Sequence, residues 1–352
     1  MKVRISKRIP FSSAKNILIR GTNWIGDAVM TLPAVAAVRN TFPGAKISIL
    51  VKPWVAEIFH LCKDIDEVSL FQSPGIHSGI AGKLRLAKEL REKRFDMAIL
   101  LQNAIEAAII TWLAGIPIRA GYNSDGRGIL LTHSVQRTDA IRKVHQIEYY
   151  LEMVKSLGCI SAETSVDLNP GMEYEILSEK LFDRFGIGKE DLVIGLAPGA
   201  TYGPAKRWFP ERFAAAADRL IDDLSAQPIL LGSSEDRKST DLVEQNAQHR
   251  LINLAGKTSL KETIAIISRC DLFISNDSGL MHISGALNIP TVAVFGSTNP
   301  ITTSPVGDKS VVIYKGASCS PCLKEICPTD FRCMDMIGVE EVVENAKRLL
   351  TE

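Results

Sequence analysis

Short apolar runs and longer amphipathic stretches alternate along the whole chain. The apolar runs have the length and residue types of buried strands, whereas the stretches between them repeat apolar residues every three or four positions, as helices do. The predicted strands are residues 15–20, 47–51, 68–71, 97–101 and 118–120 in the first half, and 192–196, 228–231, 251–254, 272–275 and 291–295 in the second. This alternation predicts an α/β protein with doubly wound parallel sheets.

An aperiodic segment, residues 159–170, interrupts the alternation near the middle of the chain. It ends in Asn169-Pro170-Gly171, a typical turn sequence. We therefore predict two domains, residues 1–170 and 171–352, that face a central cleft, the usual place for a ligand. The last predicted helix, residues 339–350, is assigned to the second domain, with the alternative that it packs back on the first.

Charge and composition narrow the class of protein. The 41 lysines and arginines nearly balance the 40 acidic residues, so global charge does not favour nucleic acid as a partner. The apolar runs are much shorter than the about 20 residues of a membrane span. Residues 1–16 carry scattered basic side chains without an apolar core, which argues against a secretory signal. They predict a flexible basic tail, with contact to acidic lipid headgroups as a weaker alternative.

Four of the seven cysteines are concentrated near the carboxyl terminus, at Cys319, Cys322, Cys327 and Cys333. We call these four residues the cysteine cluster. Without a secretory signal, a reducing compartment is expected, in which structural disulfides are rare. Two close cysteines followed by two more are compatible with a tetrahedral structural zinc site, although the spacing is tighter than in common zinc ribbons. Four plain reduced thiols are the equal alternative.

A polar turn, Asn276-Asp277-Ser278-Gly279-Leu280-Met281-His282, lies between a predicted strand and a predicted helix. Parallel α/β sheets bind ligands at the carboxyl ends of their strands, and helix N–H groups near Gly279 would favour an anion. Ser278 is a candidate helix cap, and His282 follows four residues later on the same helical face. The plain alternative is a capped helix with a half-buried histidine.

Residues 197–210 form a second loop between a predicted strand and a predicted helix. The loop combines small residues with the hydroxyl of Thr201 and the cations of Lys206 and Arg207, a combination that suits a diphosphate. Alternatively, it is a solvated surface loop in which Trp208 packs into the core.

Two more turns of this kind follow strands in the second half, at residues 232–236 and 253–257. In the first of them, Glu235 is a candidate acceptor for the hydroxyl groups of ribose or another sugar, or else an ordinary first-turn helix acid. Four ligand-type turns at one sheet edge predict that the second domain holds a nucleotide.

The first half has a different turn after its first strand. Gly21 and Gly26 have the spacing of a phosphate-binding loop, but Asp27 follows, and its carboxylate would repel a phosphate. Asp27 is instead a candidate general base, with a helix-capping acid as the alternative. Residues 28–40 then have a helical period, in which Pro33 predicts a kink or a second start.

A second acidic motif, Asp64-Ile65-Asp66, matches the Asp-x-Asp pattern of metal-dependent sugar transferases. It lies in a short connection between a predicted helix and a predicted strand, so we interpret it as turn residues. The ligand-type turns have no other acidic cluster nearby, and the sequence therefore does not support a Mg²⁺ site.

Three motifs in combination resemble a known family. Gly26-Asp27 with Leu32-Pro33, Pro204-Ala205-Lys206-Arg207-Trp208 and the turn at residues 276–282 resemble the ADP-heptose:lipopolysaccharide heptosyltransferases of glycosyltransferase family 9. The resemblance spans nearly the whole chain in order. It implies a GT-B fold of two Rossmann-like domains, with the acceptor in residues 1–170 and the ADP-sugar in residues 171–352.

The resemblance also implies a reaction, in which L-glycero-D-manno-heptose would move from ADP-heptose to the first heptose of the lipopolysaccharide inner core, with inversion. The roles of the residues are argued from charge: protein groups alone would stabilise the departing ADP, so no metal cofactor is expected. Asp27 would be the base. The donor would be bound by Thr201, Lys206, Glu235, Asp277, Ser278, Gly279 and His282. The acceptor would be bound by Asn103, Arg127 and His145, each of which is equally well explained as ordinary surface.

The implied location is the cytoplasm, in peripheral contact with the cytoplasmic face of the inner membrane, where the acceptor is linked to lipid. Nucleic acid is not an expected partner. Two rival activities stay open: a heptosyltransferase that acts on Kdo-lipid A, and a nucleotide-sugar epimerase of similar architecture. A dehydrogenase is disfavoured because the dinucleotide fingerprint is missing after the first strand.

Overall fold

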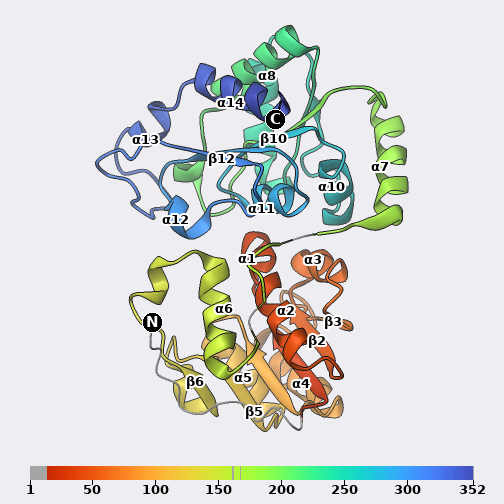
Figure 1. The fold of residues 1–352 in the computed structure, drawn as a ribbon, viewed down its shortest axis with the longest axis vertical. Helices are drawn as coiled ribbons and strands as arrows, with labels where there is room; N and C mark the ends of the chain where they lie inside the picture. The colour runs from red at the N-terminus through yellow and green to blue at the C-terminus, as the bar shows by residue number, and fades with distance from the viewer. Residues whose placement is uncertain (1–13, 161, 167, 352) are drawn as a thin grey trace. The chain divides into compact units, whose positions relative to one another are not determined.

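A computed structural model describes residues 14–351 except 161 and 167, and the chain divides into two compact units, Met1–Val166 and Asp167–Glu352 (Figure 1). The boundary lies inside the aperiodic segment. Most of the predicted basic tail, residues 1–13, lies outside the described residues. Among the described residues, no helix combines the length and the apolar character needed to cross a membrane.

The first unit contains a parallel sheet with the strand order β3-β2-β1-β4-β5-β6. Its strands are β1 Asn16–Arg20, β2 Lys46–Val51, β3 Glu67–Leu70, β4 Met97–Leu100, β5 Ile118–Tyr122 and β6 His133–Val135. In the register, Ile19 lies beside Ile49 on one side and Ile99 on the other. These central strands are apolar on both faces because helices cover both faces, which explains their continuous apolar runs.

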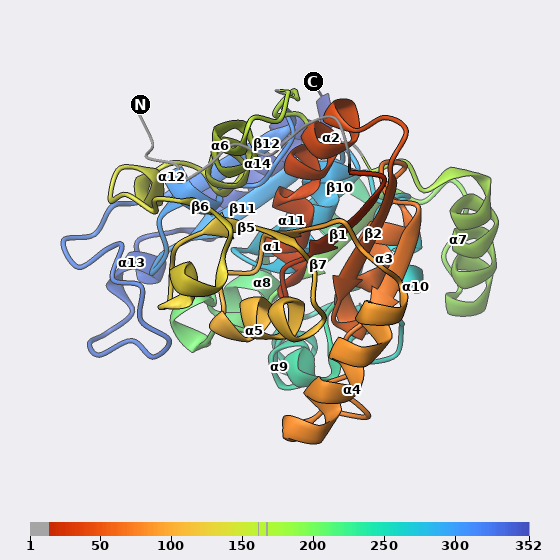
Figure 2. The ribbon, with the colours of Figure 1, turned by 90° about the horizontal axis from the view of Figure 1, so that it is seen from below.

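Helices cover the first sheet in two groups. The helices are α1 Ile25–Met30, α2 Leu32–Thr41, α3 Ala56–His60, α4 Gly79–Glu92, α5 Ile105–Leu113 and α6 Gln146–Leu157, with short 3₁₀ turns η1 Pro53–Val55, η2 Arg127–Leu130 and η3 Ile141–Lys143. Figure 2 shows α4 and α5 on one side of the strands and α2 and α6 on the other. Pro33 lies in the first turn of α2, so the predicted restart of the helix is confirmed.

The second unit repeats this arrangement with the strand order β12-β11-β10-β7-β8-β9. Its strands are β7 Val193–Ala197, β8 Gln227–Leu230, β9 Ile252–Asn253, β10 Leu272–Asn276, β11 Thr291–Phe295 and β12 Ser310–Tyr314. All the neighbouring strands pair in parallel. Two parallel sheets flanked by helices confirm the predicted α/β class.

The helices of the second unit are α7 Gly171–Phe185, α8 Pro210–Leu224, α9 Arg237–Asn246, α10 Leu260–Ile267, α11 Gly279–Ala286, α12 Pro300–Thr303, α13 Arg332–Asp335 and α14 Val339–Thr351, with 3₁₀ turns η4 Pro204–Lys206 and η5 Ser234–Asp236. Helix α14 packs on α8 and on strands β10 and β11 of its own unit. Val342, Val343 and Ala346 form its buried side.

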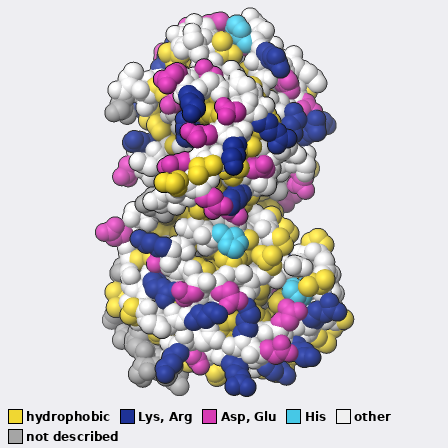
Figure 3. Space-filling model, turned by 90° about the vertical axis from the view of Figure 1, so that its right-hand side faces the viewer, with side chains coloured by type: hydrophobic (Ala, Val, Ile, Leu, Met, Phe, Trp, Pro, Cys, Tyr) yellow, Lys and Arg dark blue, Asp and Glu magenta, His cyan; other side chains and the backbone are white. Residues whose placement is uncertain are grey.

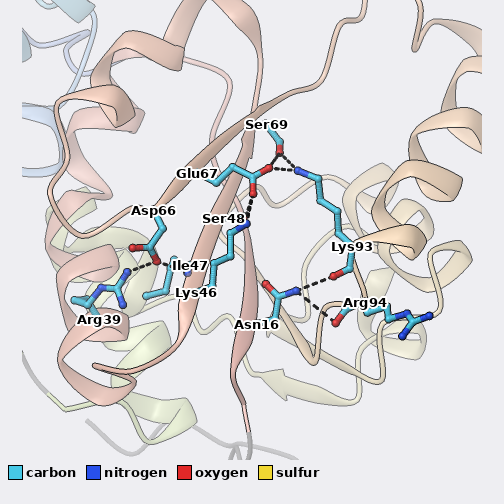
Figure 4. Close-up of polar contacts among 10 residues, drawn as sticks. All are labelled: Asn16, Arg39, Lys46, Ile47, Ser48, Asp66, Glu67, Ser69, Lys93 and Arg94. Carbon is cyan, nitrogen blue, oxygen red and sulfur yellow. Dashed lines mark hydrogen bonds and ion pairs between the residues drawn. The ribbon is translucent and has the colours of Figure 1, made fainter.

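Polar side chains tie the strands of the first sheet together away from the ligand-type turns (Figure 4). Asp66 accepts hydrogen bonds from the backbone N–H of Ile47 at 2.7 Å and from Arg39 at 2.6 Å. The acidic motif at residues 64–66 is therefore part of a structural turn, as interpreted from the sequence. Next to it, Glu67 pairs with Lys46 and Lys93, and these cations lower the pKa of Glu67 to about 2.

Candidate active site

Each sheet has one point at which the chain changes direction between neighbouring strands. In the second unit this point lies between β7 and β10, because β8 and β9 continue to one side and β11 and β12 to the other. Loops that leave two such strands in opposite directions open a crevice at their carboxyl ends. The loop at residues 198–210 and the turn at residues 277–279 both begin there, so the fold brings the two main predicted ligand turns together.

Lys206 and Asp277 form an ion pair at this point, although they lie 71 residues apart in sequence. Lys206 Nζ lies 2.7 Å from Asp277 Oδ2, and the two side chains are only 15% and 5% exposed. The ammonium also lies 5.1 Å from the ring centroid of Tyr202. The predicted diphosphate cation is thus held in a largely buried position, where its charge is already balanced by a carboxylate that was itself predicted to bind the donor.

Asn276 fixes both ends of the loop that carries Lys206. Its side-chain amide donates to the carbonyl of Pro198 at 2.8 Å, and its side-chain oxygen accepts from the backbone N–H of Trp208 at 2.9 Å. Trp208 is fully buried and donates through Nε1 to the carbonyl of Ile337 at 3.1 Å. Trp208 therefore packs into the core, and the loop is held by buried polar contacts.

The turn after β10 leads into α11, with Ser278 at the N-cap position. The Ser278 hydroxyl does not cap the helix; it lies 3.0 Å from the hydroxyl of Ser275. The predicted capping bond is therefore wrong, and the first-turn N–H groups from Gly279 onward keep their capacity to bind an anion. His282 is more deeply buried than the half-buried alternative predicted, one turn further into the helix.

Sequence reasoning missed the turn after β11. Ser297 and Thr298 are buried, and their hydroxyl oxygens have no hydrogen-bond partner among the described residues. Strand β11 is the neighbour of β10, so these hydroxyls lie at the same sheet edge. The sequence Gly296-Ser297-Thr298 directly after an apolar strand was the signal that could have identified them.

Glu235 and Thr201 are exposed on the neighbouring loops. The adjacent Asp236 is buried and forms a capping box, in which its carboxylate accepts from the Ser233 backbone N–H at 3.0 Å and from the Ser233 hydroxyl at 2.7 Å. The same carboxylate packs against Gly199, where an added Cβ would lie 2.1 Å from Asp236 Oδ1. Asp236 is therefore structural, whereas Glu235 is available to a ligand.

In the first unit, Asp27 lies in the first turn of α1 and is partly exposed. Helix α1 packs on α6, and the buried Tyr150 of α6 interacts electrostatically with the carboxylate of Asp27. Burial, with a smaller contribution from Asp27, raises the pKa of the Tyr150 hydroxyl well above its usual value. Because α1 is the first helix after β1, Asp27 lies near the carboxyl end of β1, where a base that faces a ligand is expected.

The three predicted acceptor residues have structural contacts. Arg127 is fully buried and donates to the carbonyl of Tyr122 at 2.8 Å and to Asn103 Oδ1 at 3.2 Å. Burial lowers the pKa of Arg127 to about 10. His145 is the N-cap of α6, where its Nδ1 accepts from the Ile147 backbone N–H at 3.2 Å. Arg127 therefore clamps the ends of β4 and β5, and it offers no exposed surface to an acceptor.

The four members of the cysteine cluster line one cavity, together with Ala205 and Ser297. Each of them is a free thiol. Among the described residues, however, no three histidine, cysteine or acidic side chains are arranged to hold a metal ion. The structural zinc site thus stays a prediction.

The segment that carries the cluster also supports the loop of Lys206. The backbone N–H of Ala205 donates to the carbonyl of Glu325 at 3.0 Å, and the Tyr202 hydroxyl donates to the carbonyl of Leu323 at 2.8 Å. Leu323 in turn donates its backbone N–H to the carbonyl of Ser297 at 2.8 Å. This segment therefore contacts both the loop of Lys206 and the turn after β11.

Comparison with protein families matches residues 83–331 to glycosyltransferase family 9 (heptosyltransferase). This chain belongs to glycosyltransferase family 9. Lipopolysaccharide heptosyltransferase 2 of Escherichia coli (strain K12) is 32% identical over 311 residues, which cover 84% of this chain and 87% of that protein.

Two solved structures of family 9 extend the similarity to nearly the full length. E. coli ADP-heptose lipopolysaccharide heptosyltransferase II gives a TM-score of 0.80 at 27% identity, covering 96% of this chain and 98% of that chain. A family 9 glycosyltransferase from Veillonella parvula DSM 2008 gives a TM-score of 0.85 at 25% identity, covering 98% of each chain. These similarities confirm the GT-B fold, and the chain is a glycosyltransferase.

Proposed function

We propose that this chain transfers L-glycero-D-manno-heptose from ADP-heptose to the first heptose of the lipopolysaccharide inner core, with inversion at the anomeric carbon. Relatives from two enterobacteria bear the name lipopolysaccharide heptosyltransferase 2. The observation that carries the proposal is the ion-paired, largely buried Lys206, which lies with the N-terminus of α11 at the carboxyl ends of β7 and β10. This combination suits the diphosphate of an ADP-sugar.

The second unit would bind the donor and stabilise the departing ADP. Negative charge grows on the diphosphate as the glycosidic bond to it breaks, and fixed positive groups lower the energy of that state. Lys206 and the N–H groups near Gly279 would supply the charge, with hydroxyl groups from Thr201, Ser297 and Thr298 as further donors. The Lys206 ammonium would donate to the diphosphate as well as to Asp277, and Asp277 would accept hydrogen bonds from the heptose. His282 and Glu235 would contact the phosphate or the sugars.

The first unit would bind the acceptor and activate it. The acceptor hydroxyl attacks the anomeric carbon of the donor while Asp27 takes the hydroxyl proton, so a new C–O bond forms as the bond to ADP breaks. Asn103 and His145 would contact the acceptor, and Arg127 would hold their loops in place. The acceptor is linked to lipid, so the proposal includes peripheral contact with the cytoplasmic face of the inner membrane.

The test of this proposal is transfer from ADP-heptose to a core acceptor that ends in one heptose, followed by mass analysis of the product. Asp27→Asn should lower turnover at least about 100-fold, because it removes the base, and ADP binding measured by calorimetry should not change. The matched control is Asp139→Asn in the same unit, where the side chain is 92% exposed. Unchanged turnover in Asp27→Asn would refute the base assignment.

Two arms of the same assay separate the rival activities. A nucleotide-sugar epimerase would convert ADP-heptose when no acceptor is present. A heptosyltransferase for Kdo-lipid A would use an acceptor that ends in Kdo and leave the one-heptose acceptor unchanged.

A further inference from the structure

Hydrophobic side chains reach the surface in groups, interspersed with lysines and arginines, on the face of the molecule drawn in Figure 3. Six of the eleven exposed large hydrophobic side chains among the described residues of the first unit belong to α4, α5 and η2. These six are Ile80, Leu84, Ile105, Ile109, Trp112 and Ile129. We call this surface the α4–α5 face. Ile80 is 81% exposed, Ile129 92% and Trp112 53%, which is unusual for side chains of this size.

The spacing of these residues makes the face continuous. Ile80 and Leu84 lie four residues apart on α4, and Ile105, Ile109 and Trp112 follow the same helical period on α5. Helix α4 packs against α5, and α5 packs against η2. An ion pair of 2.7 Å between Lys83 and Glu106 joins the first turns of the two helices.

The charge next to the face is positive only on balance. Helix α4 carries Lys83, Arg85, Lys88 and Arg91 against Glu89 and Glu92, and Lys83 pairs with Glu106 of α5, so four basic residues stand against three acidic ones. A helix with aliphatic residues on its exposed side, cations beside them and a tryptophan on its neighbour has the pattern of a surface that lies on anionic lipid. An interface with another protein would more commonly be depleted of such lysines.

The position of the face fits a lipid-linked substrate. Helices α4 and α5 follow parallel strands β3 and β4, so their first turns lie at the carboxyl edge of the first sheet. Asp27 follows β1 at this same edge. We propose that the α4–α5 face docks the protein on an anionic lipid bilayer and so presents the acceptor site to substrates held in the membrane. This inference rests on the proposed function for the identity of the acceptor, but not for the binding itself.

The test measures binding to vesicles by co-sedimentation, with phosphatidylglycerol–phosphatidylethanolamine vesicles in one arm and phosphatidylcholine vesicles in the other. The wild-type protein should bind the anionic vesicles in a salt-dependent way. Ile80→Glu combined with Trp112→Glu should weaken this binding at least tenfold. The matched control, Met172→Glu with Ile176→Glu, changes two exposed apolar residues on α7 of the second unit and should change binding less than twofold.

A second readout separates this inference from the proposed function. Transfer to a deacylated, water-soluble acceptor should be equal in the wild type and in the Ile80/Trp112 variant, because neither residue belongs to the proposed site. Absence of transfer by the wild type would refute the function and leave the vesicle result standing. The proposed docking surface would be refuted if the wild-type protein does not bind anionic vesicles, or if the variant binds them as well as the wild type. A dimer that the variant dissociates, without vesicle binding, would also overturn it.

Discussion

The ion pair of Lys206 and Asp277 provides the most direct test of the donor site. At 2.7 Å and an effective dielectric constant of about 20, Coulomb's law gives roughly 6 kcal/mol of attraction, most of which offsets the desolvation of the two charges. Asp277→Asn leaves the Lys206 ammonium in a largely buried place without a counter-charge. The expected loss is about 3 kcal/mol of the free energy of unfolding, the low end for a broken buried pair, because Lys206 keeps some contact with water.

The double variant distinguishes a coupled pair from two independent residues. Lys206→Met should also cost about 3 kcal/mol, but Lys206→Met with Asp277→Asn should cost at least about 2 kcal/mol less than the sum of the single changes. Urea denaturation followed by fluorescence measures these values. In thermal unfolding, each single change should lower the Tm by about 6–12 °C, given about 2–4 °C per kcal/mol for a domain of this size.

Binding of ADP gives the functional half of the test. Lys206→Met should weaken ADP at least tenfold, a loss of about 1.4 kcal/mol. Asp277→Asn should leave ADP binding equal or tighter, because the carboxylate no longer competes for the cation, while transfer of heptose falls. The assigned role of the pair would be refuted if the unfolding free-energy losses of the two single changes sum to that of the double variant within about 0.5 kcal/mol and Lys206→Met binds ADP as tightly as the wild type.

Two further predictions concern pH and metal. Lys46 and Lys93 hold the pKa of Glu67 at about 2, below its ordinary 4.5, so the pairing stabilises the fold fully above pH 4.5 and is lost as the pH falls through 2. Glu67→Gln should therefore cost about 1–2 kcal/mol at pH 7, with partial exposure taken into account, and nothing near pH 2; a cost that does not change with pH would contradict the pairing. EDTA should leave the rate of heptose transfer intact, because the proposed stabilisation of ADP uses only protein groups; activity that is lost with EDTA and restored by Mg²⁺ would contradict this. A slow loss of thermal stability in EDTA would instead indicate metal at the cysteine cluster.

The sequence predicted the central strands well because parallel strands buried on both faces are continuous apolar runs. The run 291–295 matches β11, and 272–275 matches β10 to within one residue. The helix break at Pro33 also followed from local chemistry. The charged residues 83–93 predict a helix, and the observed α4 begins four residues earlier, at Gly79, because Gly79 and Gly82 do not follow the helical pattern of the sequence.

The contacts of the site could not be predicted in the same way, because they join residues distant in sequence. The predicted roles of Lys206 and Asp277 were separate, whereas the fold pairs them directly. Arg127 looked like a surface cation, and only the three-dimensional structure shows it donating to backbone carbonyls in the core. The hydroxyls of Ser297 and Thr298 became notable only once burial and missing partners were known.

The hydrogen bonds from Tyr202 and Ala205 to the cysteine-bearing segment have one more consequence. These hydrogen bonds join the segment that carries the thiols to the loop of Lys206, although the proposed mechanism uses none of the four sulfur atoms. An oxidant that cross-links the thiols, or an ion that draws them together, would displace Leu323 and Glu325. The loop of Lys206, which is hydrogen-bonded to both residues and is proposed to bind the diphosphate, would then move as well. The redox history of a purified sample therefore belongs among the variables that set its affinity for nucleotide.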